Sequence, residues 1–160
     1  MKKFILLLSL LPLSCLAAEE SQTKNYSIGV GIGAMYSGIG ANFSFVSEND
    51  LKFISAGCTA YGSTNGAECG VGIGWIKTDL FGADSNKHGF GIYGGSLGKE
   101  HRSPYPSVFE EYDIYGAGVS YTYFMNGINK SGTTFGVSIH ATNAQFEDNI
   151  GGFFQVGYQF

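Results

Sequence analysis

Proline and charged side chains are scarce in this sequence of 160 residues, which has three prolines and only 14% charged residues. Its longest apolar run, residues 4–13, is well short of the roughly 20 residues that a helix needs to cross a bilayer. Zinc-ligand spacing, a phosphate-binding loop and a nucleotide fingerprint are also missing, because no helix follows the Gly-x-Gly runs. We therefore expect no metal site and no cofactor, and a helix-rich soluble domain is excluded.

Glycine and aromatic residues are abundant instead, with 25 glycines, 13 phenylalanines and 10 tyrosines. They alternate almost throughout the chain, which indicates β-strands with one apolar face. In residues 26–36 the even positions are apolar, from Tyr26 at one end to Tyr36 at the other, and the odd positions are mostly glycine. The sequence therefore predicts an all-β fold. The same division recurs in residues 39–46, 69–76 and 113–125.

The two faces of these strands must be assigned to an inside and an outside. Glycine makes a poor water-facing surface but a good lining for a narrow barrel, whereas bulky apolar side chains suit contact with lipid. This favours a transmembrane up-and-down β-barrel with its rings outward over a soluble lipocalin-like barrel with its rings inside. Four further segments have the length of spanning strands, so we expect eight antiparallel strands. The additional strands are residues 51–62, 88–99, 133–143 and 151–160.

An even number of strands places both termini at one end of the barrel. Short turns rich in Asn, Asp, Gly and Ser are predicted at this end, at residues 47–50, 81–87 and 126–132. Only one loop at the opposite end, residues 100–111, is long enough for a binding surface. Its charged residues predict a solvated rim, with contact to a divalent ion or lipopolysaccharide as the alternative. The opposite-end loops are residues 36–38, 63–68, 100–111 and 145–150, and the charged residues are His101, Arg102, Glu110, Glu111 and the nearby Asp113.

The start of the chain predicts export. A basic beginning and an apolar run precede small residues near Ala18, which is the pattern of a cleaved signal peptide. We place this signal at residues 1–18 and a single outer-membrane barrel domain at residues 19–160. Cys15 leaves lipidation open as a variant of the same export.

Cleavage of the signal changes the charge balance. It removes Lys2 and Lys3, which leaves seven of the nine basic residues against thirteen acidic ones, so the formal charge falls from −4 to −6. An acidic chain is poorly suited to a polyanion, and nucleic acid is therefore not an expected partner.

Two cysteines, Cys58 and Cys69, remain after cleavage. An even pair in an exported protein is a disulfide candidate, because the periplasm is oxidising. A hairpin centred between Ser63 and Thr64 places the two cysteines directly opposite each other, close enough to be linked. The alternative is two unpaired thiols in adjacent strands.

The last strand carries the most specific pattern, an alternating apolar face that ends on a terminal phenylalanine. Behind an export signal, this strand resembles the C-terminal assembly signal of outer-membrane barrel proteins. Together with the strand pattern, the resemblance extends over the mature chain to small eight-stranded barrels such as the OmpX-like proteins and the OmpA transmembrane domain. It implies an outer-membrane location, contact with membrane lipids and lipopolysaccharide, and recognition by the barrel-assembly machinery. The residues of the signal are Phe154, Val156, Tyr158 and Phe160.

A short segment resembles a second family. His140, Thr142 and Asn143 look like the His-x-Ser-Asn element of PagL-type lipid A deacylases, which are also eight-stranded outer-membrane barrels. The resemblance implies His140 as base, Thr142 at the nucleophile position and Asn143 in the oxyanion hole. Threonine replaces the serine of that family, and residues 151–160 contain no carboxylate to orient the histidine. Strand parity also points His140 and Thr142 into the barrel, away from a lipid substrate, which favours a hydrogen-bonded lumenal histidine.

These features favour a non-enzymatic outer-membrane barrel with a structural or surface-interaction role in a Gram-negative envelope. A wide pore is not expected, because side chains fill the space inside eight strands. Two alternatives stay open. One is a lipid A deacylase-like enzyme that uses His140 and Thr142, and the other is a periplasmic ligand-binding barrel, which would be extractable without detergent.

Overall fold

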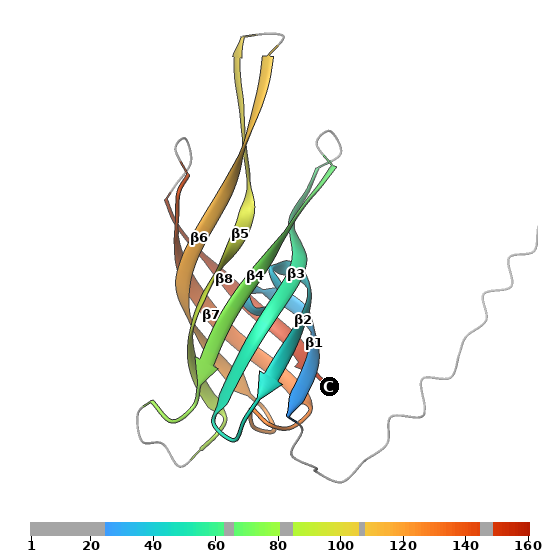
Figure 1. Cartoon of the computed structure of the whole chain (residues 1–160), viewed down its shortest axis with the longest axis vertical. Helices are drawn as coiled ribbons and strands as arrows, with labels where there is room; N and C mark the ends of the chain where they lie inside the picture. Colours follow the sequence, from blue (N-terminus) through green and yellow to red (C-terminus); the bar gives the residue numbers. More distant parts are fainter. Residues whose placement is uncertain (1–24, 63–65, 81–84, 106–107, 145–148) are drawn as a thin grey trace, which may run out of the picture.

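The chain forms a closed antiparallel barrel in which each strand pairs with its sequence neighbours and β8 pairs with β1 (Figure 1). The predicted all-β fold of eight antiparallel strands is therefore confirmed. The strands are β1 Tyr26–Gly33, β2 Gly38–Val46, β3 Asp50–Gly62, β4 Gly66–Lys77, β5 His88–Tyr105, β6 Val108–Phe124, β7 Gly132–Thr142 and β8 Ile150–Gln159. The computed structural model describes residues 25–62, 66–80, 85–105, 108–144 and 149–160, with only the backbone for residues 60–62, 66, 100–105 and 108–111.

The expected signal segment, residues 1–18 with Cys15, lies outside the described residues. So do residues 63–65, on which the predicted β3–β4 turn is centred. Among the residues that are described, no helix has the length and apolar character needed to span a membrane.

The two ends of the barrel differ. At the terminal end, as we call it below, β1 begins, β8 ends, and turns connect β2 to β3, β4 to β5 and β6 to β7. At the opposite end, the loop end, the β3–β4 and β5–β6 hairpins extend beyond the barrel wall (Figure 1). This arrangement places both ends of the barrel domain on one side, as an even strand number requires.

The barrel closes through a short stretch of pairing between β1 and β8. Gly29 lies opposite Gln159, and the pairing continues to Ile32 opposite Val156. The backbone N–H of Phe160 then donates to the carbonyl oxygen of Ile28 at 2.8 Å. Closure removes the sheet edges that an open eight-stranded sheet would expose.

Alternation along the strands separates an apolar outer face from a small and polar inner face. In β1, Ile28 is exposed and Ser27 is buried; in β7, Ile139 is exposed and His140 is buried. The predicted orientation of the apolar face, away from the interior, is confirmed on these strands.

The first connection at the loop end corrects one prediction. β1 ends at Gly33, and Ala34–Tyr36 form a short 3-10 helix, η1, that folds into the barrel. Positive φ angles at Gly33, Ser37 and Gly38 (114°, 53° and 96°) turn the chain inward and back out. Tyr36 lies in the β1–β2 connection, close to the predicted loop of residues 36–38, but it is 0% exposed, so its placement on the outer face was wrong. The period of two continues through η1 in the sequence and therefore gives no sign that the strand has ended.

The third connection at the loop end also differs from the predicted loop of residues 100–111. β5 and β6 continue past the wall as a two-stranded ribbon, which we define as residues 98–105 and 108–114. Pairing of β5 with β4 ends at Gly95, and pairing of β6 with β7 ends at Gly116. Among the described residues, the ribbon strands therefore pair only with each other. Residues 106–107 and the side chains of 100–105 and 108–111 lie outside the description, including His101, Arg102, Glu110 and Glu111 of the predicted charged rim. Asp113, the remaining residue of that rim, is exposed.

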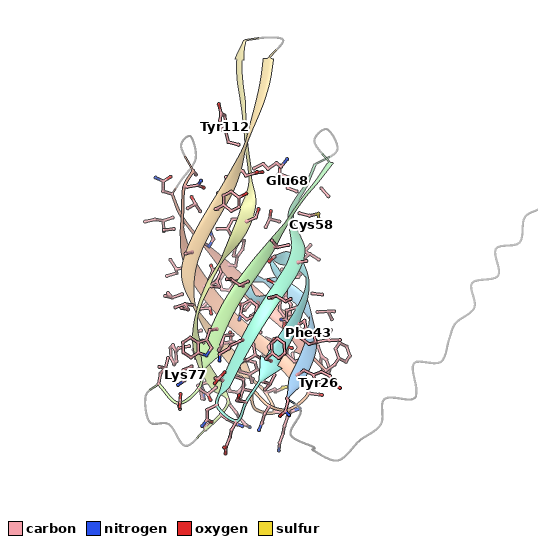
Figure 2. All side chains as sticks on the ribbon, viewed as in Figure 1. Tyr26, Phe43, Cys58, Glu68, Lys77 and Tyr112 are labelled. Atoms are coloured by element: carbon pink, nitrogen blue, oxygen red, sulfur yellow. A yellow bond between two sulfur atoms is a disulfide. The ribbon has the colours of Figure 1, made fainter. Side chains whose placement is uncertain are left out.

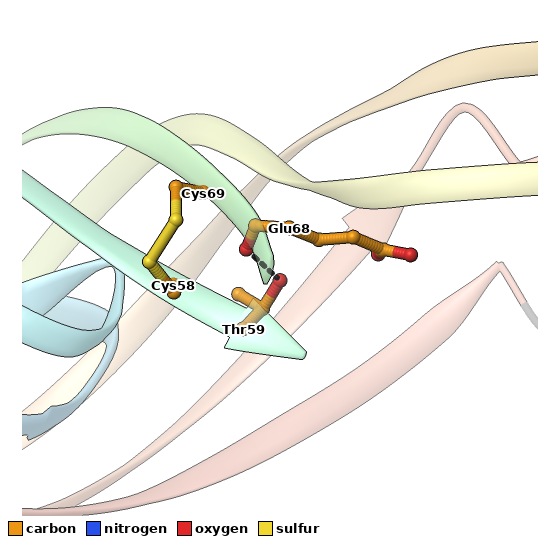
Figure 3. The surroundings of a disulfide bond; sticks show 4 residues. All are labelled: Cys58, Thr59, Glu68 and Cys69. Atoms are coloured by element: carbon orange, nitrogen blue, oxygen red, sulfur yellow. Dashed lines mark hydrogen bonds between the residues drawn. A yellow bond between two sulfur atoms is a disulfide. The ribbon is translucent and has the colours of Figure 1, made fainter. Parts of the chain in front are cut away.

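Cys58 and Cys69 are cross-strand partners and form a disulfide (Figure 3). The register from Asp50 opposite Lys77 up to this pair is the one that the spacing of the cysteines predicts. A bulge at Thr59 then shifts the pairing by one residue, so Ala60 lies opposite Glu68. Glu68, expected in the loop, belongs to β4, because the hairpin continues past the disulfide to Gly66.

Large apolar residues fill the terminal half of the interior, which was expected to be lined mostly by glycine and small residues. Leu51, Phe53, Ile76 and Phe124 are buried there, near the terminal ends of their strands. They form one cluster with η1. Ile128, in the connection between β6 and β7, is 2% exposed and belongs to the same cluster.

Candidate functional site

The outer surface of the barrel wall is apolar on all eight strands. Ile54 is 58% exposed and Phe154 is 85% exposed, and both lie on the outward-facing register. Soluble monomers seldom expose contiguous apolar patches of more than a few hundred Å². Further exposed members of the surface are Ile28, Val30, Ile32, Ile39, Val71, Ile73, Ile92, Val119, Val137, Ile139 and Val156.

Aromatic rings gather on the outer surface near the terminal end. Tyr26 stacks on Phe43 with ring centroids 6.4 Å apart, and Phe43 meets Phe45 edge-on at 5.2 Å. On the far side of the barrel, Phe90 contacts Tyr121 at 5.2 Å. Figure 2 labels Tyr26 and Phe43 at this end. Other exposed rings of this belt are Trp75, Phe135, Tyr158 and Phe160, and Tyr115 stands near the loop end.

Two lysines reach the only tryptophan of the sequence within this belt. The Nζ atoms of Lys52 and Lys77 lie 5.6 and 5.8 Å from the Trp75 ring centroid. Lys77 also forms an ion pair with Asp79 at 3.4 Å. Tryptophan flanked by long basic side chains is typical of the boundary between hydrocarbon and water. The strand pattern of the sequence did not predict that both lysines would meet one ring.

Inside the barrel, glycines form a cradle for Tyr36. A Cβ atom added to Gly31 would approach the Tyr36 ring at 2.6 Å, and one added to Gly157 would overlap its hydroxyl. Cβ atoms on Gly40 and Gly57 would meet the backbone oxygen of Tyr36. The bare inner face of β1–β3 and β8 therefore makes room for η1.

Polar side chains anchor η1 within this cradle. The Tyr36 hydroxyl lies 3.0 Å from Thr134 Oγ1 on β7, and Asn42 Nδ2 donates to the Met35 carbonyl oxygen at 3.2 Å. Ser37 Oγ and Ser55 Oγ are 2.7 Å apart. These buried bonds connect η1 to β2, β3 and β7, and they satisfy polar groups that have left water.

A second layer of polar residues closes the seam of the barrel near the terminal end. Ser27 Oγ donates to Gln159 Oε1 at 2.8 Å, and Gln159 Nε2 donates to Asn42 Oδ1 at 3.3 Å. Ser44 Oγ donates to the same oxygen of Asn42 at 3.1 Å. The chain of bonds thus links β8 to β1 and β2 through the interior.

The deacylase alternative named three residues, His140, Thr142 and Asn143, and these lie in three different environments. His140 is buried inside the barrel, as strand parity predicted; its Nδ1 lies 3.1 Å from the Tyr93 hydroxyl, and its ring stacks on Phe153 at 4.9 Å. Thr142 Oγ1 accepts a hydrogen bond from the backbone N–H of Ala144 at 3.3 Å.

Asn143 Oδ1 accepts from the backbone N–H of Tyr115 at 2.8 Å, so it ties the end of β7 to β6. This bond uses the carbonyl oxygen of the amide and not its Nδ2 donor, which is the group that an oxyanion hole would need. Tyr93 was missed at the sequence level. The outward Phe90 and Ile92 on the same strand give the signal, since their parity places Tyr93 inside.

A small cavity lies beside η1, near the loop end of the described interior. The cavity beside η1 has a volume of about 10 Å³, enough for about one water molecule. Its lining includes Ser37, Tyr93 and Phe153. Within the described residues, no group of three or more His, Cys, Asp and Glu is placed to hold a metal ion.

The four residues of the predicted assembly signal share the outer face of β8. Phe154, Val156, Tyr158 and Phe160 are all exposed, and the Tyr158 and Phe160 rings meet edge-on at 4.9 Å. Their recognition by assembly machinery stays a prediction.

Comparison with known proteins yields no relative. No family model matches the chain, and neither a curated protein nor a solved structure matches it. The barrel geometry and its residues therefore carry the functional argument alone.

Proposed function

We propose that this protein is an outer-membrane β-barrel of a Gram-negative envelope, with a structural or surface-interaction role. The observation that carries the proposal is the apolar outer surface, with its belt of rings and lysines at the terminal end. In water such a surface would drive aggregation, whereas in a bilayer it matches the lipid-facing band of a spanning barrel.

Orientation in the membrane follows from the strand number. The short turns of the terminal end face the periplasm, as in single-chain barrels with an even number of strands, and the longer hairpins face outward. The ribbon then stands outside the cell. Among the described residues its two strands pair with each other, and the backbone N–H of Lys99 donates to Glu68 Oε2 at 3.3 Å.

The filled interior supports a role other than that of a pore. η1 occupies the glycine cradle, and the apolar cluster of Leu51, Phe53, Ile76 and Phe124 occupies the terminal half. Eight strands enclose only enough space for side chains. The observations favour neither alternative function: a ligand-binding barrel needs an interior cavity, and a deacylase needs its histidine directed toward lipid.

Cell fractionation tests the location directly. The expressed protein is expected in the outer-membrane fraction, and its migration in gel electrophoresis should change on boiling because the closed barrel resists unfolding by detergent. Release in soluble form without detergent, with identical migration before and after boiling, would contradict the proposal.

Lysine labelling of intact cells tests the orientation. Lys99 on the ribbon and Lys87 and Lys130 at the terminal end are all exposed. A polymer-linked amine-reactive ester too large to cross the outer membrane should label Lys99 on intact cells. Lys87 and Lys130 should react only after the membrane is permeabilised. Equal labelling of all three on intact cells would refute the proposed orientation.

A further inference from the structure

An apolar groove on the outside of the barrel carries charged groups at one end only. It crosses β4–β7 and has a volume of about 600 Å³, which is within the usual range for small-molecule sites. Two neighbouring rows of outward-facing cross-strand partners form it. One row is Trp75, Ile92, Val119 and Ile139, and the other is Lys77, Phe90, Tyr121 and Val137.

The groove climbs obliquely along the barrel. Its Lys77 end lies at the last residue of β4, at the terminal end, whereas Val137 and Ile139 lie well inside β7. Strands of spanning barrels tilt by about 35–45°, so a row of partners across them rises from the interface toward the bilayer centre. An acyl chain that extends inward from a headgroup follows the same direction.

The polar end of the groove presents both signs of charge. Lys52 and Lys77 lie over the Trp75 ring, Asp79 is paired with Lys77 at 3.4 Å, and Asp50 is the cross-strand partner of Lys77. Two ammonium groups thus lie over one ring, and two acidic residues flank Lys77. This set complements a headgroup that itself carries a phosphate and an ammonium group, because each charge finds an opposite one.

A second groove on the barrel gives an internal comparison. It has a volume of about 820 Å³ and crosses β1–β6, and no charged residue belongs to its lining. Both grooves therefore offer an apolar surface. Of the two, the β4–β7 groove has charged residues at one end, which we call its mouth.

We propose that the β4–β7 groove binds one phospholipid of the phosphatidylethanolamine type, an inference that rests on the proposed membrane location. The lysines hold the phosphate, the aspartates accept hydrogen bonds from the primary ammonium group, and one acyl chain lies between the two rows. Phosphatidylcholine fits less well because its quaternary ammonium has no N–H donor. Phosphatidylglycerol fits less well because it has no cation for the aspartates.

The single tryptophan, which lies in the mouth, reports on lipid binding. The protein is reconstituted in phosphatidylcholine vesicles with increasing fractions of brominated phosphatidylethanolamine, phosphatidylcholine or phosphatidylglycerol, and quenching of Trp75 gives relative association constants. We expect brominated phosphatidylethanolamine to associate about fivefold more strongly than phosphatidylcholine, the effect of one charge contact near a membrane surface. Equal association of these two lipids, or the strongest association with phosphatidylglycerol, overturns the proposal.

Charge variants sharpen this test. Asp50→Asn with Asp79→Asn should remove the preference for phosphatidylethanolamine and shift it to phosphatidylglycerol, since two lysines then remain without carboxylates. Asp113→Asn, at the loop end, is the matched control and should keep the wild-type preference. If the double variant keeps the wild-type preference, the aspartates do not recognise the headgroup and the proposal is wrong.

A substitution that narrows the groove tests the proposed acyl-chain site independently of headgroup recognition. Val137→Phe narrows the groove, whereas Ile32→Phe adds the same ring to an exposed position of β1 outside it. Mass spectrometry of the intact protein released from mild detergent should show one bound phosphatidylethanolamine in the wild type and in Ile32→Phe, but not in Val137→Phe. If Val137→Phe still carries one bound phosphatidylethanolamine, the proposed site for the acyl chain is wrong. Loss of Trp75 quenching by every brominated lipid would instead refute the membrane location, so the two failures are distinguishable.

Discussion

Tyr36 is the side chain around which the interior of the barrel is built. It is fully buried, its ring touches the inward glycines of β1 and β8, and its hydroxyl lies 3.0 Å from Thr134 Oγ1. The glycine face that the sequence displays is thus explained by one residue that the glycines accommodate. Close packing of this kind makes the interior sensitive to single atoms.

Removal of the Tyr36 hydroxyl tests its anchoring bond. Tyr36→Phe should lower the free energy of unfolding by about 1 kcal/mol, because Thr134 loses a buried partner. Tyr36→Ala should lower it by about 3–5 kcal/mol through the cavity it leaves. Urea unfolding in detergent micelles measures both, and Tyr115→Phe, an exposed tyrosine, serves as the control. Equal stability of Tyr36→Phe and wild type would argue against the bond.

A methyl group at Gly157 tests the cradle from the other side. Gly157→Ala should destabilise the barrel by about 1–3 kcal/mol, because its Cβ would overlap the Tyr36 hydroxyl and ring. When Gly157→Ala is combined with Tyr36→Leu, the loss of unfolding free energy should be smaller than the sum of the losses in the two single variants. Gly94→Ala is the control, since its Cβ would have its nearest contact at 3.4 Å. Strict additivity of the Gly157 and Tyr36 effects would show that the two residues do not meet.

Residue-level prediction from sequence succeeded where alternation is uninterrupted. The outward Ile28 and the inward His140 both follow from parity. It failed at Tyr36, because the apolar period continues through η1 while the backbone leaves the strand at Gly33. The turns at the two ends of η1 use Gly33 and Gly38, and glycines at these positions also fit the alternating pattern of the strands. The sequence therefore gives no separate sign of these turns.

At the scale of elements, the β3–β4 hairpin shows how far spacing determines register. The cysteine spacing gave the pairing up to Cys58 opposite Cys69, but the bulge at Thr59 left no trace in the sequence. The β5–β6 hairpin was mistaken for a loop for a related reason. Its ribbon extends past the wall, where neither face has to stay apolar, so the alternation that marks a wall strand is lost.

The disulfide yields a prediction at this scale. Mass spectrometry of unreduced protein should find the peptides of Cys58 and Cys69 linked, and the double variant Cys58→Ser with Cys69→Ser should lose about 2–4 kcal/mol of unfolding free energy. The variant should still migrate anomalously before boiling, because the barrel wall closes at β1 and β8, away from this hairpin. Free alkylation of both cysteines in unreduced protein would contradict the pairing.

At the scale of the whole molecule, the account depends on what touches the outer surface. The apolar wall, the belt of rings and the two lysines over Trp75 all lie on the same side of the sheet, and the interior is filled without them. Sequence alternation predicted this division along the wall strands, although the rings of Tyr36, Phe53 and Phe124 lie inside the barrel. The groove between β4 and β7 was not predictable, since its walls come from four strands whose mutual register no local pattern determines.

Fluorescence of Trp75 in phosphatidylcholine vesicles tests this central claim most directly, because no other tryptophan contributes. The account predicts blue-shifted emission that brominated acyl chains quench strongly, most of all when the bromines lie near the headgroup, and that aqueous iodide quenches weakly. Emission at the wavelength of tryptophan in water, quenched by iodide and unaffected by brominated lipid, would contradict the account.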